Sequence, residues 1–163
     1  MPTPMPAPSR RTALVVSGLT LGVVATGCGE GATPPPAGTR GRSDGPDETL
    51  LDEARTDLVA ALALVRAARR AHPSLRPRLV GLQRTHRDQL SVLDPEGRTG
   101  PAEGPEVPGG APEALRSVVR AEERLVRRLV TWSVAAESGP LARALAASAA
   151  GVAQQLALLE EER

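Results

Sequence analysis

Three polar side chains with useful chemistry interrupt stretches of otherwise apolar residues: His86, Glu122 and Gln155. An imidazole beside a carboxylate can form an ion pair, and the two groups can also hold a metal ion. A polar group on a buried helix face costs stability unless it finds a partner. These residues are therefore the first candidates for a binding site, or for a polar network that fixes the packing of the chain.

The apolar stretches have the spacing of buried helix faces. Leucine, valine and alanine recur at steps of three and four residues, which predicts helices over residues 47–71, 74–93, 112–136 and 139–161. The apolar stripes, with their polar interruptions, are Leu51, Ala54, Leu58, Ala61, Val65 and Ala68; Leu75, Leu79, Leu82, His86, Leu90 and Leu93; Leu115, Val118, Glu122, Leu125, Leu129, Trp132 and Ala136; and Leu141, Leu145, Ser148, Val152, Gln155 and Leu159.

The ends of these helices are marked by capping and breaking residues. Asp47 is the expected N-cap of the first helix, the His72-Pro73 pair ends it, and Ser138 is the expected N-cap of the last. Residues 94–111 are rich in Pro and Gly and have no helical pattern. The sequence predicts an all-α four-helix bundle with a long connection between its second and third helices. That connection is long enough to cross the bundle, which would make those two helices parallel, or it is simply floppy.

Counting from the turns brings the polar residues to similar levels. Glu122 and Gln155 lie nearly equally far before and after the turn at Ser138, and His86 falls opposite Asp57. We expect a buried polar network of His86, Glu122 and Gln155 at mid-bundle, with Asp57 at the same level of the first helix. The alternatives are partial exposure without a role, a small-ligand pocket, or one weak metal ion at His86 and Glu122.

The N-terminal stretch SRRTALVVSGLTLGVVATGC, residues 9–28, predicts an export signal. Its apolar run is shorter than the ~20 residues of a membrane-spanning helix, and small residues precede the single cysteine. Arg10 and Arg11 resemble the pair of a twin-arginine signal, and ATGC resembles a bacterial lipobox, in which the cysteine is lipidated. The other possibility is a buried helix that ends in an ordinary core cysteine.

The signal hypothesis sets the expected organisation and location. Residues 1–27 are a cleaved signal peptide, Cys28 carries the lipid, residues 28–46 are a flexible tether, and residues 47–163 form the bundle. The expected location is the extracytoplasmic face of the cell membrane, with the lipid anchor as the link to the membrane.

With these features the chain resembles the ferritin-like superfamily, and more narrowly the actinobacterial ferritin-like lipoproteins of unknown function. The export signal, the tether, AHPSL after the first helix and AEERL in the third helix carry the resemblance. Members with a di-iron site use a Glu from each of two helices and a Glu-x-x-His pair from each of the other two. The corresponding positions here hold Asp57, Gln83 with His86, Glu122, and Gln155 with Leu158. The resemblance thus adds Gln83 to the expected mid-bundle network, which then has five residues: Asp57, Gln83, His86, Glu122 and Gln155. The resemblance therefore implies a degenerate metal site, and we expect no bound cofactor.

Composition narrows the function classes. The 20 basic residues, all Arg, nearly balance 19 acidic ones, and Trp132 is the single aromatic residue, so a nucleic-acid partner is not expected. No Ser/His/Asp arrangement or glycine-rich phosphate loop indicates an enzyme.

We therefore expect a non-enzymatic lipoprotein with a binding or scaffolding role, and the sequence names no protein partner. The alternative is a ferritin-like metal-binding or redox protein with a partial site. A cluster of arginines near the end of the first helix is either a solvated face or a site for anionic lipids or polyanions: Arg66, Arg69, Arg70, Arg76 and Arg78.

Overall fold

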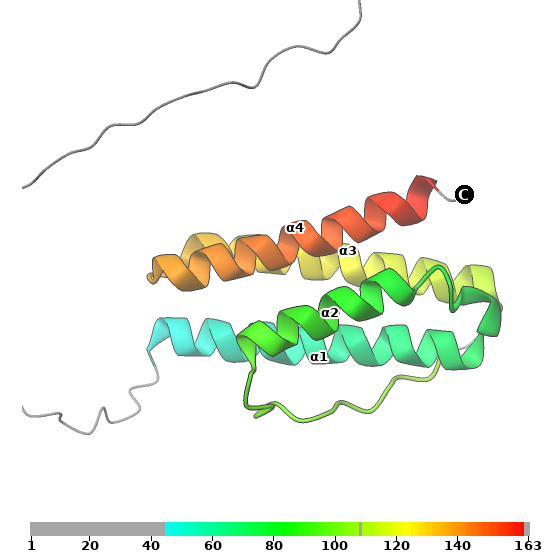
Figure 1. Cartoon of the computed structure of the whole chain (residues 1–163), viewed down its shortest axis with the longest axis horizontal. Helices are drawn as coiled ribbons and strands as arrows, with labels where there is room; N and C mark the ends of the chain where they lie inside the picture. The colour runs from blue at the N-terminus through cyan, green and yellow to red at the C-terminus, as the bar shows by residue number, and fades with distance from the viewer. Residues whose placement is uncertain (1–44, 108, 162–163) are drawn as a thin grey trace, which may run out of the picture. The chain divides into compact units, whose positions relative to one another are not determined.

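The computed structural model describes residues 45–107 and 109–161. This part of the chain is helical, without strands: α1 Pro46–Ala71, the short 3-10 helix η1 Pro73–Leu75, α2 Val80–Leu93, α3 Ala111–Ala135 and α4 Gly139–Glu161. The four α-helices pack together, which confirms the predicted all-α bundle (Figure 1). Arg10, Arg11, Cys28 and nearly all of the predicted tether lie outside the described residues.

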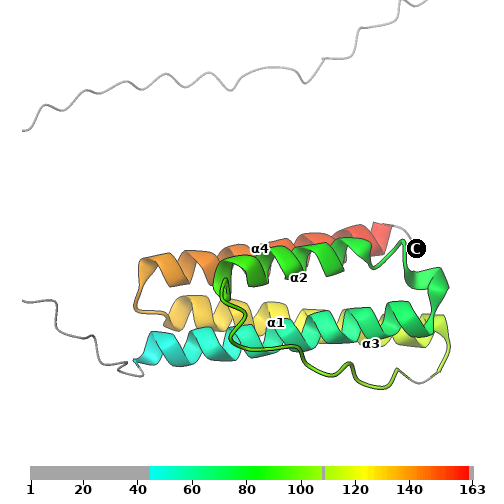
Figure 2. The ribbon, with the colours of Figure 1, turned by 60° about the horizontal axis from the view of Figure 1, so that its bottom comes forward.

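Each helix of the bundle packs on two main neighbours. Helix α1 lies against α2 and α3, and α4 lies against α3 and α2. Helices α2 and α3 therefore stand on a diagonal across the core. They run parallel, because each of them is antiparallel to α1 (Figure 2).

The connection between α2 and α3 crosses the bundle. It leaves the end of α2, runs along α1 and enters α3 at the opposite end, as Figures 1 and 2 agree. A parallel pair of helices requires such a crossing, since a short turn joins only antiparallel neighbours. Of the two possibilities left open by the sequence, the structure has the crossing. We call residues 94–110 the crossing loop.

The predicted stripes form the core. Helix α1 contributes Ala54, Leu58 and Val65 with side chains that have no exposed surface, and the other helices face them with residues of their own stripes. The fully buried large side chains include Leu58, Leu79, Leu82, Leu129, Leu145, His86, Glu122, Val65, Val118 and Val152. Two of these are polar, so the core closes around them.

Helix α1 begins one residue before the predicted N-cap. Gly45 is the N-cap and Pro46 takes the first helical position, where its missing N–H costs no hydrogen bond. The carboxylate of Asp47 accepts hydrogen bonds from the backbone N–H groups of Glu137 and Ser138, both at 2.8 Å. Asp47 therefore ties the start of α1 to the turn between α3 and α4.

The second helix begins later than predicted. We expected a helix from residue 74, but residues 73–79 form η1 and turns, and α2 starts at Val80. Pro77 has no N–H to donate to the carbonyl of Pro73, so an α-helix cannot run through this segment. Arg76 instead donates its N–H to Pro73 in the tighter 3-10 pattern.

One buried charge on α1 was not anticipated. The side chain of Arg55 is only 5% exposed; its Nε donates to the carbonyl of Leu93 at 2.6 Å, and its Nη1 pairs with Asp52 at 2.8 Å. The Leu93 carbonyl belongs to the last turn of α2, where backbone oxygens lack helical partners. Arg55 therefore fixes the end of α2 against α1.

The start of the crossing loop is organised by Asp94. Its carboxylate accepts hydrogen bonds from the backbone N–H of Thr99 at 3.0 Å and of Arg98 at 2.9 Å. Gly97, directly before Arg98, has a φ of 65°, a conformation that favours glycine. The N–H group of Thr99 and then that of Arg98 hold the pKa of Asp94 below its ordinary value of 3.8, against the opposing effect of burial.

Further along, the crossing loop lies close to α1 at Gly104. A Cβ there would stand 3.2 Å from the carbonyl oxygen of Ala63 and 3.2 Å from the Cβ of Ala67. A larger residue would have to push the loop outward.

None of the described helices is long and apolar enough to span a membrane.

We predict that Asp94→Asn lowers the free energy of unfolding at neutral pH and has little effect in acid. A carboxyl group whose pKa is lowered by folding stabilises the native state above its unfolded-state pKa, and this contribution is lost as the pH falls through the lower, native-state pKa. Urea unfolding at about pH 7 and about pH 3 measures the difference. Asp88→Asn, on the exposed face of α2, is the control. An equal loss at both pH values would contradict the role of the carboxylate charge.

Candidate functional site

The polar centre of the bundle is a contact between its two diagonal helices. His86 on α2 and Glu122 on α3 lie with Nε2 and Oε1 3.0 Å apart, and neither side chain is exposed to solvent. Their helices make no direct backbone approach. The pair therefore links α2 to α3 through the middle of the core.

The other side of the imidazole ring is held by a residue that the sequence analysis did not select. Nδ1 of His86 lies 3.3 Å from Oε1 of Gln89, and Nε2 of Gln89 donates to the carbonyl oxygen of Ser148 at 2.9 Å. Since the amide nitrogen of Gln89 must face that carbonyl, its oxygen faces the ring, and Nδ1 carries the hydrogen. One further proton then lies between His86 and Glu122, in an ion pair or in a neutral hydrogen bond.

Among the described residues, His86 is the one hydrogen-bond partner of the Glu122 side chain. Its second oxygen, Oε2, is buried and has no hydrogen-bond partner among the described residues. A buried carboxylate without enough partners is costly, because the protein interior does not replace its hydration. Within the described part of the chain, the imidazole is thus the one group that compensates this carboxylate.

The predicted five-residue network is only partly assembled. Asp57 lies on the α1–α3 face in an ion pair with Arg128, and Gln83 accepts a hydrogen bond from Arg69. Gln155 is half-buried against Gly81 of α2, where a Cβ would collide with its amide. Of the five residues, the structure brings together His86 and Glu122.

The residues that complete the contact could have been found from spacing. Gln89 lies three residues after His86, on the same face of α2. Ser148 was already on the stripe of α4, and its hydroxyl donates to the carbonyl of Ala144 at 2.9 Å. The backbone carbonyl that Gln89 reaches carries no signal in the sequence.

The di-iron arrangement of ferritin-like proteins does not fit these residues. The described residues contain no group of three or more His, Cys, Asp or Glu placed to hold a metal ion. Asp57 and Gln83, which the resemblance would place among the ligands, are both engaged by arginines. The site predicted from the sequence is therefore a buried hydrogen-bonded pair, His86 and Glu122, which offers two potential metal donors.

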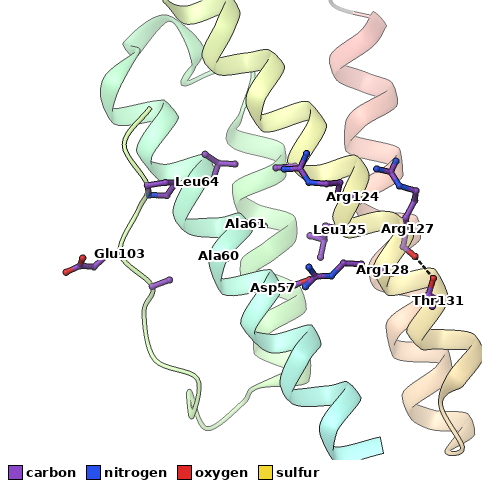
Figure 3. A pocket seen from close by; sticks show the side chains of 13 residues that line it. Asp57, Ala60, Ala61, Leu64, Glu103, Arg124, Leu125, Arg127, Arg128 and Thr131 are labelled. Carbon is purple, nitrogen blue, oxygen red and sulfur yellow. Dashed lines mark hydrogen bonds and ion pairs between the residues drawn. The ribbon is translucent and has the colours of Figure 1, made fainter. Parts of the chain in front are cut away.

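A groove lies between α1, α3 and the crossing loop, outside the core (Figure 3). Its volume is about 650 Å³, within the usual range for small-molecule sites. Apolar side chains from all three segments form much of its surface, and arginines of α3 stand along it. The lining residues are Asp57, Ala60, Ala61, Leu64, Ala102, Glu103, Pro105, Ala121, Arg124, Leu125, Arg127, Arg128 and Thr131. We call it the loop groove.

Of the three arginines that line the loop groove, one forms an ion pair with a described carboxylate and two do not. Arg128 pairs with Asp57, and its guanidinium lies 5.1 Å from the centre of the Trp132 ring. Arg124 and Arg127 have no ion pair with a described carboxylate, and Arg124 reaches toward α1 in Figure 3. Glu103 points away from the helices in the same view. The loop groove thus combines an apolar surface with available positive charge.

No protein-family model, curated protein or solved structure matches this chain.

We predict strong coupling between His86 and Glu122 in the free energy of unfolding. His86→Leu or Glu122→Leu alone strands a buried polar partner and should cost about 3 kcal/mol or more, whereas the double variant should cost less than either. Urea unfolding of the two single variants and the double variant gives the coupling energy.

Glu123→Leu, at the exposed neighbouring position on α3, is the control and should change stability by less than about 1 kcal/mol. Small, additive effects of His86→Leu and Glu122→Leu would mean that the pair does not hold the core together.

Proposed function

We propose that this chain is a non-enzymatic, lipid-anchored binding protein of the extracytoplasmic membrane face, and that its loop groove binds a small amphipathic anion. The single observation that carries the binding role is the combination of apolar floor and available arginines in that groove. The anchoring part of the proposal rests on the sequence pattern that ends at Cys28.

The finer fold within the all-α class is, in this proposal, ferritin-like. Ferritin-like bundles have one long crossover connection, and the crossing loop between the parallel helices α2 and α3 has that character. The metal function of that fold does not follow, since the polar centre has two donors held by Gln89 and by each other. In this proposal the bundle has the ferritin-like topology without the metal ligands, and it serves as a scaffold for binding at its surface.

The chemistry of the loop groove selects the ligand class. Ala60, Leu64 and Leu125 offer apolar contact, which favours a hydrocarbon or ring system. The guanidinium of Arg124 can donate paired hydrogen bonds to a carboxylate, sulfonate or phosphate oxygen pair. A molecule with an apolar body and one anionic head therefore satisfies both parts of the surface.

We predict that dodecanoate below its micellar concentration binds the purified chain, and that Arg124→Gln weakens this binding about tenfold. The loss of one charge-assisted hydrogen-bond pair accounts for a change of this size. Calorimetry measures the affinity. Fluorescence of Trp132, the single aromatic residue of the chain, reports any displacement of Arg128 from its ring.

The matched control is Arg116→Gln, which makes the same charge change on α3 outside the loop groove. Ala60→Leu fills the floor from an exposed position of α1 and should also weaken binding. Dodecanoate binding that is unchanged by Arg124→Gln and Ala60→Leu would contradict the assignment, as would the absence of binding.

We predict separately that Cys28→Ala moves the protein from the membrane fraction to the soluble fraction of cells that express it. A lipid-modified cysteine would be its membrane anchor, and alanine cannot be lipidated. Fractionation followed by immunoblotting measures the distribution. Continued membrane attachment of the variant would contradict the anchor but would leave the loop groove untouched.

A further inference from the structure

A second surface, with several arginines, lies at the C-terminal end of α1. Arg66, Arg69 and Arg70 from α1, Arg76 from the turn after η1, and Arg87 from α2 line a hollow of about 290 Å³ together with Gln83. We call it the arginine hollow. It shares no lining residue with the loop groove.

The arginines that line the arginine hollow differ from the cluster that the sequence suggested. Arg78 turns to another side, where its Nη2 donates to the carbonyl of Leu159 near the end of α4 at 3.1 Å. Arg87 takes its place, although it lies far from the others in sequence. The antiparallel pairing of α1 and α2 brings it there.

The arginine hollow has no counter-charge of its own. No Asp or Glu belongs to its lining, and none of its five guanidinium groups forms an ion pair with a described carboxylate. Like charges held together repel one another, most strongly where water is partly excluded. The negative end of the α1 dipole compensates Arg69 and Arg70 in the last turn, but it does not reach Arg87 on α2.

Part of the arginine hollow is held in position by polar contacts. Arg69 donates to the amide oxygen of Gln83, and Arg76 donates through Nε to the carbonyl oxygen of Arg69 at 3.2 Å. Nε of Arg69 is buried and has no hydrogen-bond partner among the described residues. These contacts fix two guanidinium groups, whereas the side chains of Arg70 and Arg87 make no hydrogen bond to the rest of the described chain.

We propose that the arginine hollow binds a phosphate group. Converging guanidinium groups match the oxygen pairs of phosphate in charge and in planar geometry. The volume is at the lower limit of sites for drug-sized ligands, ~300 Å³, which suits a compact anion or headgroup. The phosphate comes from a soluble phosphoanion or from the headgroup of an anionic phospholipid, and the experiment distinguishes these two sources.

The test uses the full chain with Cys28→Ala, so that no lipid anchor contributes to membrane binding. One arm titrates it with inorganic pyrophosphate in a calorimeter. The second arm measures co-sedimentation with vesicles of phosphatidylglycerol and phosphatidylcholine, compared with phosphatidylcholine alone. The variant is Arg70→Gln with Arg87→Gln, since neither side chain makes a hydrogen bond that the fold requires.

The matched control is Arg98→Gln with Arg143→Gln, an equal change in charge at two arginines that do not line the arginine hollow. We expect the Arg70/Arg87 variant to lose at least about tenfold in affinity in the arm that binds, and the control to change less than about twofold. Binding of pyrophosphate identifies a soluble phosphoanion, and binding of phosphatidylglycerol vesicles alone identifies a headgroup. No binding in either arm, or equal losses in variant and control, would overturn the proposal.

Discussion

The contact between His86 and Glu122 crosses the diagonal of the bundle, where the two backbones do not meet. Because both groups are fully buried, each compensates the other, and the spacing of α2 and α3 must keep Nε2 and Oε1 within hydrogen-bond distance. Gln89 extends this constraint to α4 by donating to the carbonyl of Ser148. Polar bonds thus link three helices, α2, α3 and α4, within the core.

The parallel direction of α2 and α3 has a second consequence, since it requires the crossing loop. That loop has few apolar residues of its own, and its path is set by Asp94 at its start and by the close approach of Gly104 to α1. The loop groove exists because Ala102 and Pro105 pass over the α1–α3 face without filling it. The binding surface is therefore a product of the topology rather than of a dedicated motif.

Much of the helical core could be predicted from the sequence, because burial follows the helical period: Leu58, Leu82, Leu129 and Leu145 all lie where their stripes place them. The start of α2 could not be predicted in this way. Whether residues 73–79 form an α-helix or a 3-10 helix with turns depends on the backbone hydrogen bond that Pro77 cannot donate. Polar partners were the least predictable. Counting from the turns put Gln155 in the polar network and the family resemblance added Gln83, whereas a close helix approach and a competing arginine hold them elsewhere.

The chain is nearly neutral, but its charges are unevenly distributed, and helix formation favours this distribution. Asp47 and Glu48 lie in the first turn of α1, and Arg69 and Arg70 lie in its last turn, so both sets complement the helix dipole. Several carboxylates outside the lining of the arginine hollow are engaged by other groups: Asp47 at the α3–α4 turn, Asp94 in the crossing loop and Asp57 with Arg128. The arginines at the other end of α1 form no ion pair with a described carboxylate. The same electrostatics that stabilise the helices therefore leave one end of the bundle suited to an external anion.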